Sequence, residues 1–261
     1  GGSLTNLYRP NPDAATVPSF ATLSSQGLYR SDFDGLAVAD TLHFLDDRLL
    51  ITVGVRRQQI RALTDGLTTY DRSATSPSVG VVVKPWQNWS IYGNYIEGLS
   101  QGGQAPVDAA NPNEIFPPFV SKQHEIGVKH DAGRMLTTVS LFQLKRPSAL
   151  TDPVTRIYSV SGEQSNRGIE VESYGEIARG WRVISGFTLM EAKLTKTAGG
   201  VNQGNFAPDV SRFSANLNLE WDASFLPGMT LTGRAIYTGS QYLDASNTRE
   251  IPSWTRYDID A

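Results

Sequence analysis

Few residues in this sequence have the types and spacing needed for acid–base or metal chemistry. The only histidines are His43, His124 and His130, and the last two stand six positions apart. On one strand, that spacing separates them by roughly 20 Å, so they could not share a metal ion. Glu170 and Glu172 would lie about 6.6 Å apart on one strand face, a separation that suits a glycosidase pair. Glycoside hydrolysis is therefore the one reaction that the spacing suggests.

No other feature of the sequence supports an enzyme. The chain has no GxSxG, HExxH, P-loop or dinucleotide-binding motif, and its cysteine count of 0 excludes thiolate sites and disulfides. The wet interior of a β-barrel requires polar side chains, so solvation of such an interior is the simpler interpretation of Glu170 and Glu172. We therefore expect a protein that is not an enzyme and has no catalytic residue, bound metal or cofactor.

Long alternating segments predict strands with one apolar and one acidic face. From Gln164 onward, Ile169, Val171 and Ser173 point one way, while Gly168, Glu170, Glu172, Tyr174 and Glu176 point the other way. Strands of soluble sandwiches are usually about 5–6 residues long, and these segments are much longer. Their length and acidic face indicate an all-β fold, an antiparallel transmembrane β-barrel with lipid outside and water inside.

The links between the predicted strands alternate in length. Short links are expected at Asp46 to Arg48, Gln87-Asn88, Asp131 to Arg134, Ala178 to Gly180 and Asp222 to Gly228. Long loops are expected at Thr64 to Thr75, Gln101 to Val120, Ser148 to Ser165, Lys196 to Asp209 and Ser240 to Ser253. This alternation is typical of bacterial outer-membrane barrels, whose short turns face the periplasm.

The positions of the tryptophans support that orientation. Short links are flanked by Trp86, Trp89, Trp181 and Trp221, where an aromatic belt would meet the inner membrane interface. The alternative, that tryptophan simply favours strands, stays open. The turn Arg179-Gly180 is accordingly predicted to lie in the periplasm, and the loop Gln101 to Val120 outside the cell.

Composition excludes several other classes of protein. Hydrophobic residues make up 39% of the chain, and no apolar run is long enough for a membrane-spanning helix. The formal net charge of −3 provides no basic surface for nucleic acid. The first residues, GGSLTNLYRP, have neither the charged nor the apolar region of a signal peptide. An exported protein would therefore appear here as a mature segment.

Six segments together resemble the barrel of TonB-dependent outer-membrane siderophore receptors. Asp40 to Ile60 resembles a hairpin of that family with an acidic Asp-Arg turn, and Lys84 to Gly103 resembles its Lys-Pro-Trp turn and tyrosine-rich strand. The other segments are Pro117 to Asp131, Ser140 to Pro147, Asn166 to Trp181 and Tyr237 to Ala261. They occur in the family's order, and Tyr237 to Thr255 of the last segment is most similar to receptors for ferric hydroxamate siderophores.

This resemblance implies active uptake of a ferric siderophore by a multi-pass protein of the bacterial outer membrane, in contact with its lipid. Members of the family have an N-terminal plug domain with a TonB-contacting segment, the TonB box, and a barrel of about 22 strands. We expect about 11–12 strands here, no plug domain, and one partial barrel domain over residues 1–261. Two open edges would leave backbone groups unpaired in lipid, so we expect this segment alone not to insert stably.

Aromatic side chains in or beside the long loops are the candidates for siderophore contacts under this resemblance. They are Phe116, Phe119, Tyr158, Phe206, Tyr242 and Trp254. Packing within the loops or in an outer aromatic belt is the alternative role for each of them. Cobalamin or a saccharide is the alternative ligand, and a passive porin-type barrel is the alternative function.

The alternation also predicts which side chains contact lipid. The lipid-facing set is Ile169, Val171, Phe213, Ala215, Leu217 and Leu219. The set that faces the interior or the plug is Glu170, Glu172, Asn216, Asn218 and Glu220.

Overall fold

The computed structural model describes residues 28–261, which form one large antiparallel sheet with long loops at one end. The N-terminal residues considered above for a signal peptide lie outside the described residues. Within the described part, no helix has both the length and the hydropathy needed to cross a membrane.

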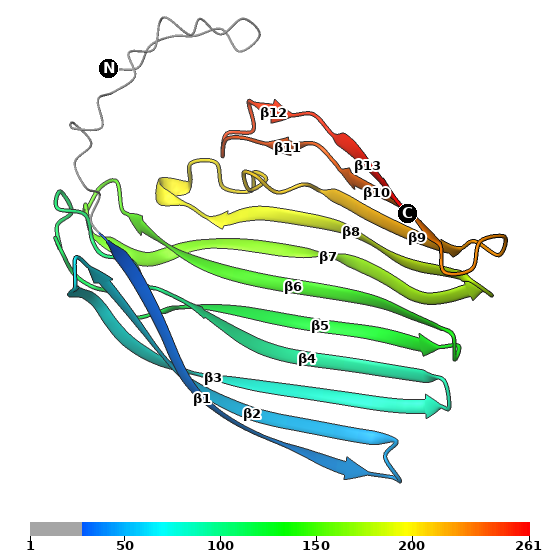
Figure 1. Ribbon diagram of the computed structural model, residues 1–261. Coiled ribbons are helices and arrows are strands. Elements are labelled where there is room, and N and C mark those ends of the chain that lie inside the picture. The colour runs from blue at the N-terminus through cyan, green and yellow to red at the C-terminus, as the bar shows by residue number, and fades with distance from the viewer. Residues whose placement is uncertain (1–27) are drawn as a thin grey trace, which may run out of the picture.

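Eleven strands form the main sheet, and they pair in chain order, with β13 following β10. They are β1 (Tyr29–Phe44), β2 (Leu49–Thr64), β3 (Leu67–Trp86), β4 (Trp89–Ser100), β5 (Phe119–Asp131), β6 (Met135–Thr151), β7 (Tyr158–Ala178), β8 (Trp181–Lys196), β9 (Phe213–Asp222), β10 (Thr230–Thr238) and β13 (Trp254–Asp260). Figure 1 shows the sheet curving like a barrel wall, with β1 and β13 at its edges. The predicted antiparallel barrel wall of about 11–12 strands is confirmed.

The chain leaves the main sheet between β10 and β13. There it forms a small two-stranded sheet of β11 (Gln241–Tyr242) and β12 (Glu250–Ile251). A short 3-10 helix, η3 (Ala198–Gly200), follows β8 at the same end of the sheet (Figure 1). These elements belong to the long loops and are not part of the barrel wall.

The strands are long enough to extend beyond a membrane. β7 has 21 residues and β3 has 20, whereas a tilted strand needs only about 9–11 residues to cross a bilayer. The additional residues continue the pairing toward the long loops, as in the pair Arg146↔Gln164. The wall therefore positions the loops on a rigid sheet.

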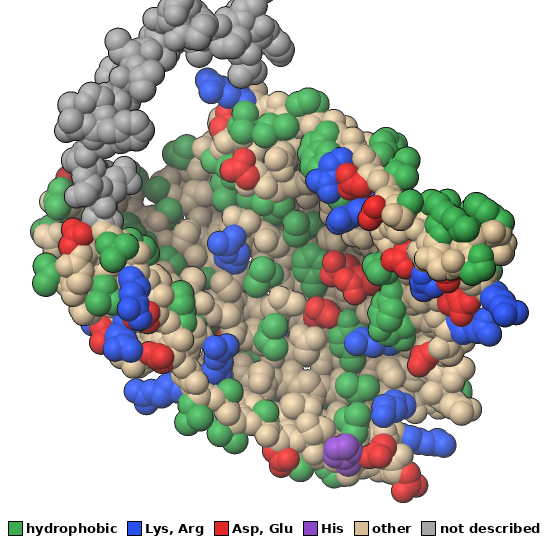
Figure 2. Space-filling model, viewed as in Figure 1, with side chains coloured by type: hydrophobic (Ala, Val, Ile, Leu, Met, Phe, Trp, Pro, Cys, Tyr) green, Lys and Arg blue, Asp and Glu red, His purple; other side chains and the backbone are tan. Residues whose placement is uncertain are grey.

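Register places apolar and polar side chains on opposite faces of the sheet. Ile169 pairs with Leu189, which pairs with Phe213, whereas Glu170 pairs with Thr188. Partners lie on the same face, so apolar and polar rows alternate along the strands. Figure 2 shows the hollowed face, which carries charged side chains of both signs. The predicted separation of the two faces is confirmed, while contact of the apolar face with lipid stays a prediction.

The two faces differ in crowding at the level of Glu170. Ile169 and Leu189 on the apolar face are 41% and 51% exposed, whereas Ser140, the partner of Glu170 on the polar face, is 5% exposed. Side chains converge on the inner side of a curved sheet and diverge on its outer side. At this level of the wall, the difference agrees with a polar interior and an apolar exterior, whereas nearer the short turns Tyr174 and Ile184 of the hollowed face are 55% and 56% exposed.

Most predicted links agree with the structure, and two do not. The short links all fall between the ends of consecutive strands. The predicted long loop Thr64 to Thr75 is wrong, because β2 and β3 continue to a tight turn at Asp65 and Gly66, both with positive φ. An Asp-Gly pair is a strong hairpin signal, and it decides the turn here. The loop Ser148 to Ser165 is likewise shorter than predicted, because β6 and β7 continue pairing and leave only residues 152–157.

A small core lies where a loop covers the polar face near the long-loop end. Ile60 and Ala62 of β2 are 0% exposed, and Tyr70 of β3 is 3% exposed. Leu99 and Ile115 pack against them. Ile115 belongs to the loop of residues 101–118, so this loop folds onto the inner wall instead of standing clear of it.

Candidate functional site

Hydrogen bonds organise the middle of the hollowed face. Tyr92 Oη donates a 2.6 Å hydrogen bond to Glu125 Oε1, and Lys129 Nζ lies 5.1 Å from the centre of the tyrosine ring. A Cβ at Gly127 would come within 2.6 Å of that ring. The glycine therefore allows Tyr92 to lie flat against the wall.

The two glutamates that suggested glycoside hydrolysis belong to this polar surface. Glu170 accepts a 3.1 Å hydrogen bond from Thr188 Oγ1, and Glu172 has Thr138 and Gly186 as its cross-strand partners. Neighbours of this kind solvate a carboxylate but do not distinguish a general acid from a general base. The arrangement fits a solvated wall.

The histidines lie apart from one another. The His124 ring lies 4.9 Å from that of Tyr95, and the His130 ring stacks 4.2 Å from that of Trp89. His43 Nδ1 lies 2.6 Å from a carboxylate oxygen of Asp47 in the first short turn. Nowhere in residues 28–261 do three or more potential metal ligands gather.

The loop of residues 101–118 is fixed to the inner wall by backbone and side-chain contacts. The Gly102 N–H donates a 3.0 Å hydrogen bond to Tyr70 Oη. A Cβ at Gly102 would lie 2.1 Å from the carbonyl oxygen of Pro117. Only glycine fits this close approach of two backbone segments.

This loop also joins the next one, residues 152–157, and we call the two the first loop pair. Asn111 Oδ1 accepts a 2.8 Å hydrogen bond from the Tyr158 N–H, and Asn111 Nδ2 donates a 2.9 Å bond to the Tyr158 carbonyl. Arg156 forms a 2.6 Å ion pair with Asp108. The ring of Phe116 packs edge-on against that of Tyr158, with centres 5.5 Å apart.

The loops of residues 197–212 and 239–253, the second loop pair, repeat this arrangement. Asn247 Oδ1 accepts a 2.9 Å hydrogen bond from the Phe206 N–H, and Asn247 Nδ2 donates a 3.0 Å bond to the Phe206 carbonyl. The Phe206 ring stacks on Tyr242 at 6.1 Å, and the guanidinium of Arg212 lies 4.8 Å from the Phe206 ring centre. Lys193 lies 5.5 Å from the same centre.

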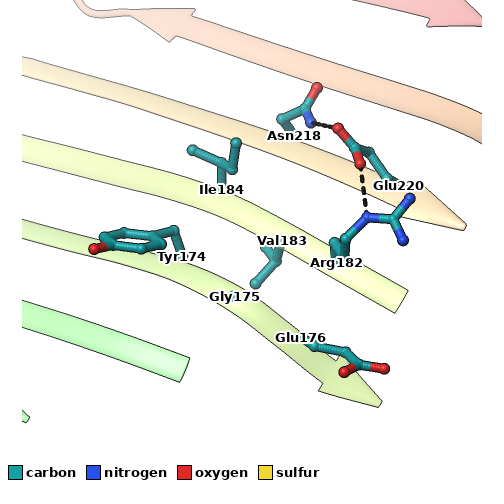
Figure 3. Close-up of a pocket in the computed structure, with 8 residues that line it drawn as sticks. All are labelled: Tyr174, Gly175, Glu176, Arg182, Val183, Ile184, Asn218 and Glu220. Atoms are coloured by element: carbon teal, nitrogen blue, oxygen red, sulfur yellow. Dashed lines mark hydrogen bonds and ion pairs between the residues drawn. The ribbon is translucent and has the colours of Figure 1, made fainter. Parts of the chain in front are cut away.

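The opposite end of the hollowed face contains an open depression of about 370 Å³ (Figure 3). Arg182 Nε donates a 3.0 Å bond to Glu220, and its two terminal nitrogens donate 2.7 and 2.8 Å bonds to both oxygens of Asp222. Tyr174 and Ile184 form the apolar part of the lining. All three nitrogens of Arg182 therefore bond carboxylates of β9, so this cluster fixes the short-turn end and offers no free cation.

Aromatic side chains flank the same short turns. Trp181 and Trp221 are cross-strand partners with ring centres 5.4 Å apart, and Phe225 lies 5.9 Å from Trp221. Trp86 pairs with Trp89 beside another short turn. The predicted positions of the tryptophans at the short links are confirmed, and the assignment of this end to the periplasm stays a prediction.

Four of the six predicted ligand contacts form two aromatic pairs. Phe116 packs with Tyr158 and Phe206 with Tyr242, each across a loop pair. The other two begin strands: Phe119 lies opposite Ser100, and Trp254, which is 46% exposed, lies opposite Thr238. The structure therefore brings the candidates to one end of the sheet, as two pairs and two single residues, without testing their contact with a ligand.

Sequence reasoning missed the side chains that hold this end together. Asn111 and Asn247 were not singled out, although each lies in a run of small and polar residues that is typical of turns. Their partners are 47 and 41 residues away in the chain. No local pattern predicts a pairing over that distance. Arg182 was missed for the same reason, since its carboxylate partners lie 38 and 40 residues away.

Comparison with known proteins gives this architecture a family. Residues 1–261 match the family described as "TonB dependent receptor-like, beta-barrel". The chain is 37% identical to the "Ferrichrome receptor FcuA" of Yersinia enterocolitica over 98% of the chain and 35% of the receptor. It is 28% identical to the "Probable TonB-dependent siderophore receptor PiuA" of Acinetobacter baumannii over 88% of the chain and 35% of the receptor.

A solved structure agrees with the sequence relatives. The structure of BauA, the ferric preacinetobactin receptor from Acinetobacter baumannii, is 38% identical, with a TM-score of 0.84 over 98% of this chain and 39% of that one. The chain thus spans about a third of the length of the curated relatives. With a family match over its whole length and a relative of this identity, the chain belongs to the β-barrel of the TonB-dependent receptors, a family of outer-membrane proteins that are not enzymes.

Proposed function

We propose that the complete protein encoded by this gene takes up a ferric siderophore across the outer membrane, and that a hydroxamate siderophore is its ligand. The observation that carries this proposal is the 37% identity to a ferrichrome receptor over 98% of the chain. The chain corresponds to 35% of that receptor.

The chain would contribute wall and loops to this uptake. Its hollowed face is polar and hydrogen-bonded, as with Tyr92 and Glu125, which suits the lining of a water-filled passage. Its long-loop end carries aromatic residues beside polar groups, the combination that ligand pockets favour. Energy would come from TonB through a plug domain, as the family membership implies.

Growth of an iron-limited strain tests the ligand. The gene is deleted, and iron-loaded ferrichrome, ferrioxamine B and ferric citrate are supplied one at a time, with and without the gene restored. We expect ferrichrome to rescue growth only with the gene present and only in a strain that has TonB. Rescue that is independent of TonB would contradict active uptake and favour a passive pore.

Ferric preacinetobactin is the second candidate ligand. The observation that favours it is the 38% identity and TM-score of 0.84 to the receptor solved under that name. The same growth panel includes it as a separate supplement. Rescue by ferric preacinetobactin without rescue by ferrichrome would replace the hydroxamate proposal and keep siderophore uptake.

The aromatic candidates differ in their suitability as ligand contacts. Trp254 is 46% exposed, and its cross-strand row passes through Thr238 and Ser214 to Thr188 beside Glu170, which belongs to the hollowed face. It is therefore our first choice for a contact. Phe116, Phe119, Tyr158, Phe206 and Tyr242 remain candidates that also pack within the loops or the wall.

Thiol labelling in intact cells tests the orientation of the wall. Gln104 lies in a long loop and Arg179 in a short turn. With Gln104→Cys and Arg179→Cys in the complete protein, a reagent that cannot cross the outer membrane should label the first and not the second. Labelling of the second alone would reverse the proposed orientation.

A further inference from the structure

Two asparagine side chains connect the long loops in the same way. Asn111 and Asn247 each bond both the N–H and the carbonyl of a single residue, at 2.8 to 3.0 Å. The residue is Tyr158 at the start of β7 for Asn111, and Phe206 in the loop of residues 197–212 for Asn247. A carboxamide has the donor and acceptor of a peptide group, so each side chain takes the place of a strand partner. Each loop pair is therefore closed by a two-bond contact outside the regular sheet.

In both contacts the bonded residue is aromatic and packs on a second aromatic ring. That ring comes from the loop that supplies the asparagine: Phe116 for Tyr158, and Tyr242 for Phe206. The asparagine holds the backbone of one aromatic residue, and packing between the two rings holds their side chains in place. One asparagine side chain therefore contributes directly to the geometry of each aromatic pair.

Other bonds tie each loop pair further. Arg156 Nη2 donates to a carboxylate oxygen of Asp108 at 2.6 Å in the first loop pair. In the second, Asn205 Nδ2 donates to the Ala245 carbonyl at 3.0 Å, and the Asp209 N–H donates to the Tyr242 carbonyl at 2.8 Å. The loops in each pair therefore have several shared contacts, with the asparagine contact at the aromatic rings.

We propose that Asn111 and Asn247 are positioning residues that make the four loops into two units, each of which moves as one body and presents its aromatic pair to the ligand. This inference rests on the proposed uptake function, because it assigns the units a part in ligand binding. Neither asparagine needs to touch the ligand itself. Each acts through the aromatic residue whose backbone it holds.

Isosteric substitutions test the two units separately. Asn111→Asp and Asn247→Asp keep the shape and lose the donor to the carbonyl. Asn113→Asp and Asn202→Asp are the matched controls, because they add the same charge within the first and the second loop pair at residues that have positive φ. Asn111→Ala and Asn247→Ala provide a second test without added charge.

Hydrogen–deuterium exchange of the complete protein in detergent decides whether the units exist. We expect Asn111→Asp to speed exchange about tenfold in both loops of the first pair and to leave the second pair unchanged, with the converse for Asn247→Asp. The control variants should exchange like the wild type. Unchanged exchange in the alanine variants, or faster exchange in all loops alike, would overturn the inference.

Uptake of iron-loaded ferrichrome separates positioning from a purely structural role. Loss of either contact should raise the half-saturating concentration about five- to tenfold and leave the rate at saturation unchanged. The positioning role would be overturned if the uptake rate at saturation fell five- to tenfold instead. It would also be overturned if the half-saturating concentration stayed unchanged in a variant whose loops exchange hydrogen faster. If wild-type protein takes up no ferrichrome, the hydroxamate proposal fails. Hydrogen–deuterium exchange then decides by itself whether each loop pair moves as one body.

Discussion

The two ends of the sheet are held by different kinds of contact. At the short-turn end, Arg182 pairs in register with Glu220, and Trp181 pairs in register with Trp221. At the long-loop end, the Asn247 contact with Phe206 lies outside the main sheet. The strand ladder thus fixes one end, and side chains that reach between loops fix the other.

This difference separates stability from recognition. Contacts between cross-strand partners can change only if the pairing register of a strand shifts. A shift of one residue would move the apolar side chains of that strand to the polar face. Contacts between loops can change while the wall stays intact. We therefore expect substitutions at the wall and turns to affect stability, and substitutions at the loop pairs to affect ligand binding.

The largest effect is expected from a charge on the apolar face. Val171→Arg should destabilise the protein by about 2–4 kcal/mol if the position lies near the middle of the bilayer. Glu172→Arg, one residue away on the hollowed face, is the matched control and should cost much less. Urea titrations of the protein folded into lipid vesicles measure both free energies of unfolding. Equal losses would contradict the assignment of the two faces.

A smaller loss is expected from a methyl group at the contact between the first loop pair and the wall. Gly102→Ala places a Cβ 2.1 Å from the Pro117 carbonyl oxygen, so the two segments of this loop must separate beside the bond from Gly102 to Tyr70. Such overpacking typically costs about 1–3 kcal/mol.

Gly98→Ala is the control for that change, because no atom lies within 4 Å of a Cβ there. It should change the free energy of unfolding by less than about 0.5 kcal/mol. Limited proteolysis of residues 101–118 reports the loop directly. Equal resistance of the two variants would show that the loop tolerates the methyl group.

Substitution of one tryptophan at each end of the sheet tests whether the two ends have separate roles. Trp181→Ala removes the stack on Trp221, which should cost about 0.5–1.5 kcal/mol beyond the lost burial and leave ferrichrome affinity unchanged. Trp254→Ala should weaken ferrichrome binding several-fold with little loss of stability. Thermal unfolding and binding titrations measure the two properties. The reverse pattern would contradict the separate roles of the two ends.

The smallest effect is expected from pH. Backbone N–H groups of Thr155 and Val154 donate to Asp152 and hold the pKa of its carboxyl below the usual range. The hydroxyl of Thr248 donates to Asp244 and is the main cause of a lowered pKa of that carboxyl. A lowered pKa in the folded state means that this stabilisation is complete above the ordinary value of about 3.9 and is lost as the pH falls through the lowered value.

A spin label measures that change in the first loop pair. Val154 is 88% exposed, so a label on Val154→Cys should not disturb packing. Its mobility should stay constant from pH 7 to about pH 4 and rise below that. With Asp152→Ala added, the label should be mobile at every pH. A rise in mobility between pH 7 and pH 5 would indicate that another group controls the loop.

The wall was predictable from the sequence because the alternation that defines its strands involves residues adjacent in the chain. Alternation at Ile169, Glu170 and Val171 defines the two faces, and the register confirms it. The turn at Asp65 and Gly66 was missed because the polar residues after it resemble a loop, although they continue β3. Tertiary pairing with β2 overrides their weak strand preference.

The long-loop end was predictable only in part. The aromatic candidates fall in the loops as expected, but nothing in the sequence indicates that Phe116 pairs with Tyr158 or Phe206 with Tyr242. These pairs depend on loop conformations that Asn111 and Asn247 fix over long distances in the chain. Composition can identify such residues as turn formers, but their partners emerge only from the folded sheet.

Exposure of neighbouring residues on β7 to lipid and to water distinguishes the two faces of the wall. Spin labels are placed on Val171→Cys and Glu170→Cys in the complete protein in lipid vesicles, and each is exposed to oxygen, which partitions into lipid, and to a water-soluble nickel chelate. Oxygen should relax the label at 171 more strongly, and the chelate should relax the label at 170 more strongly. The opposite pattern would contradict an apolar face toward lipid and a polar face toward the interior.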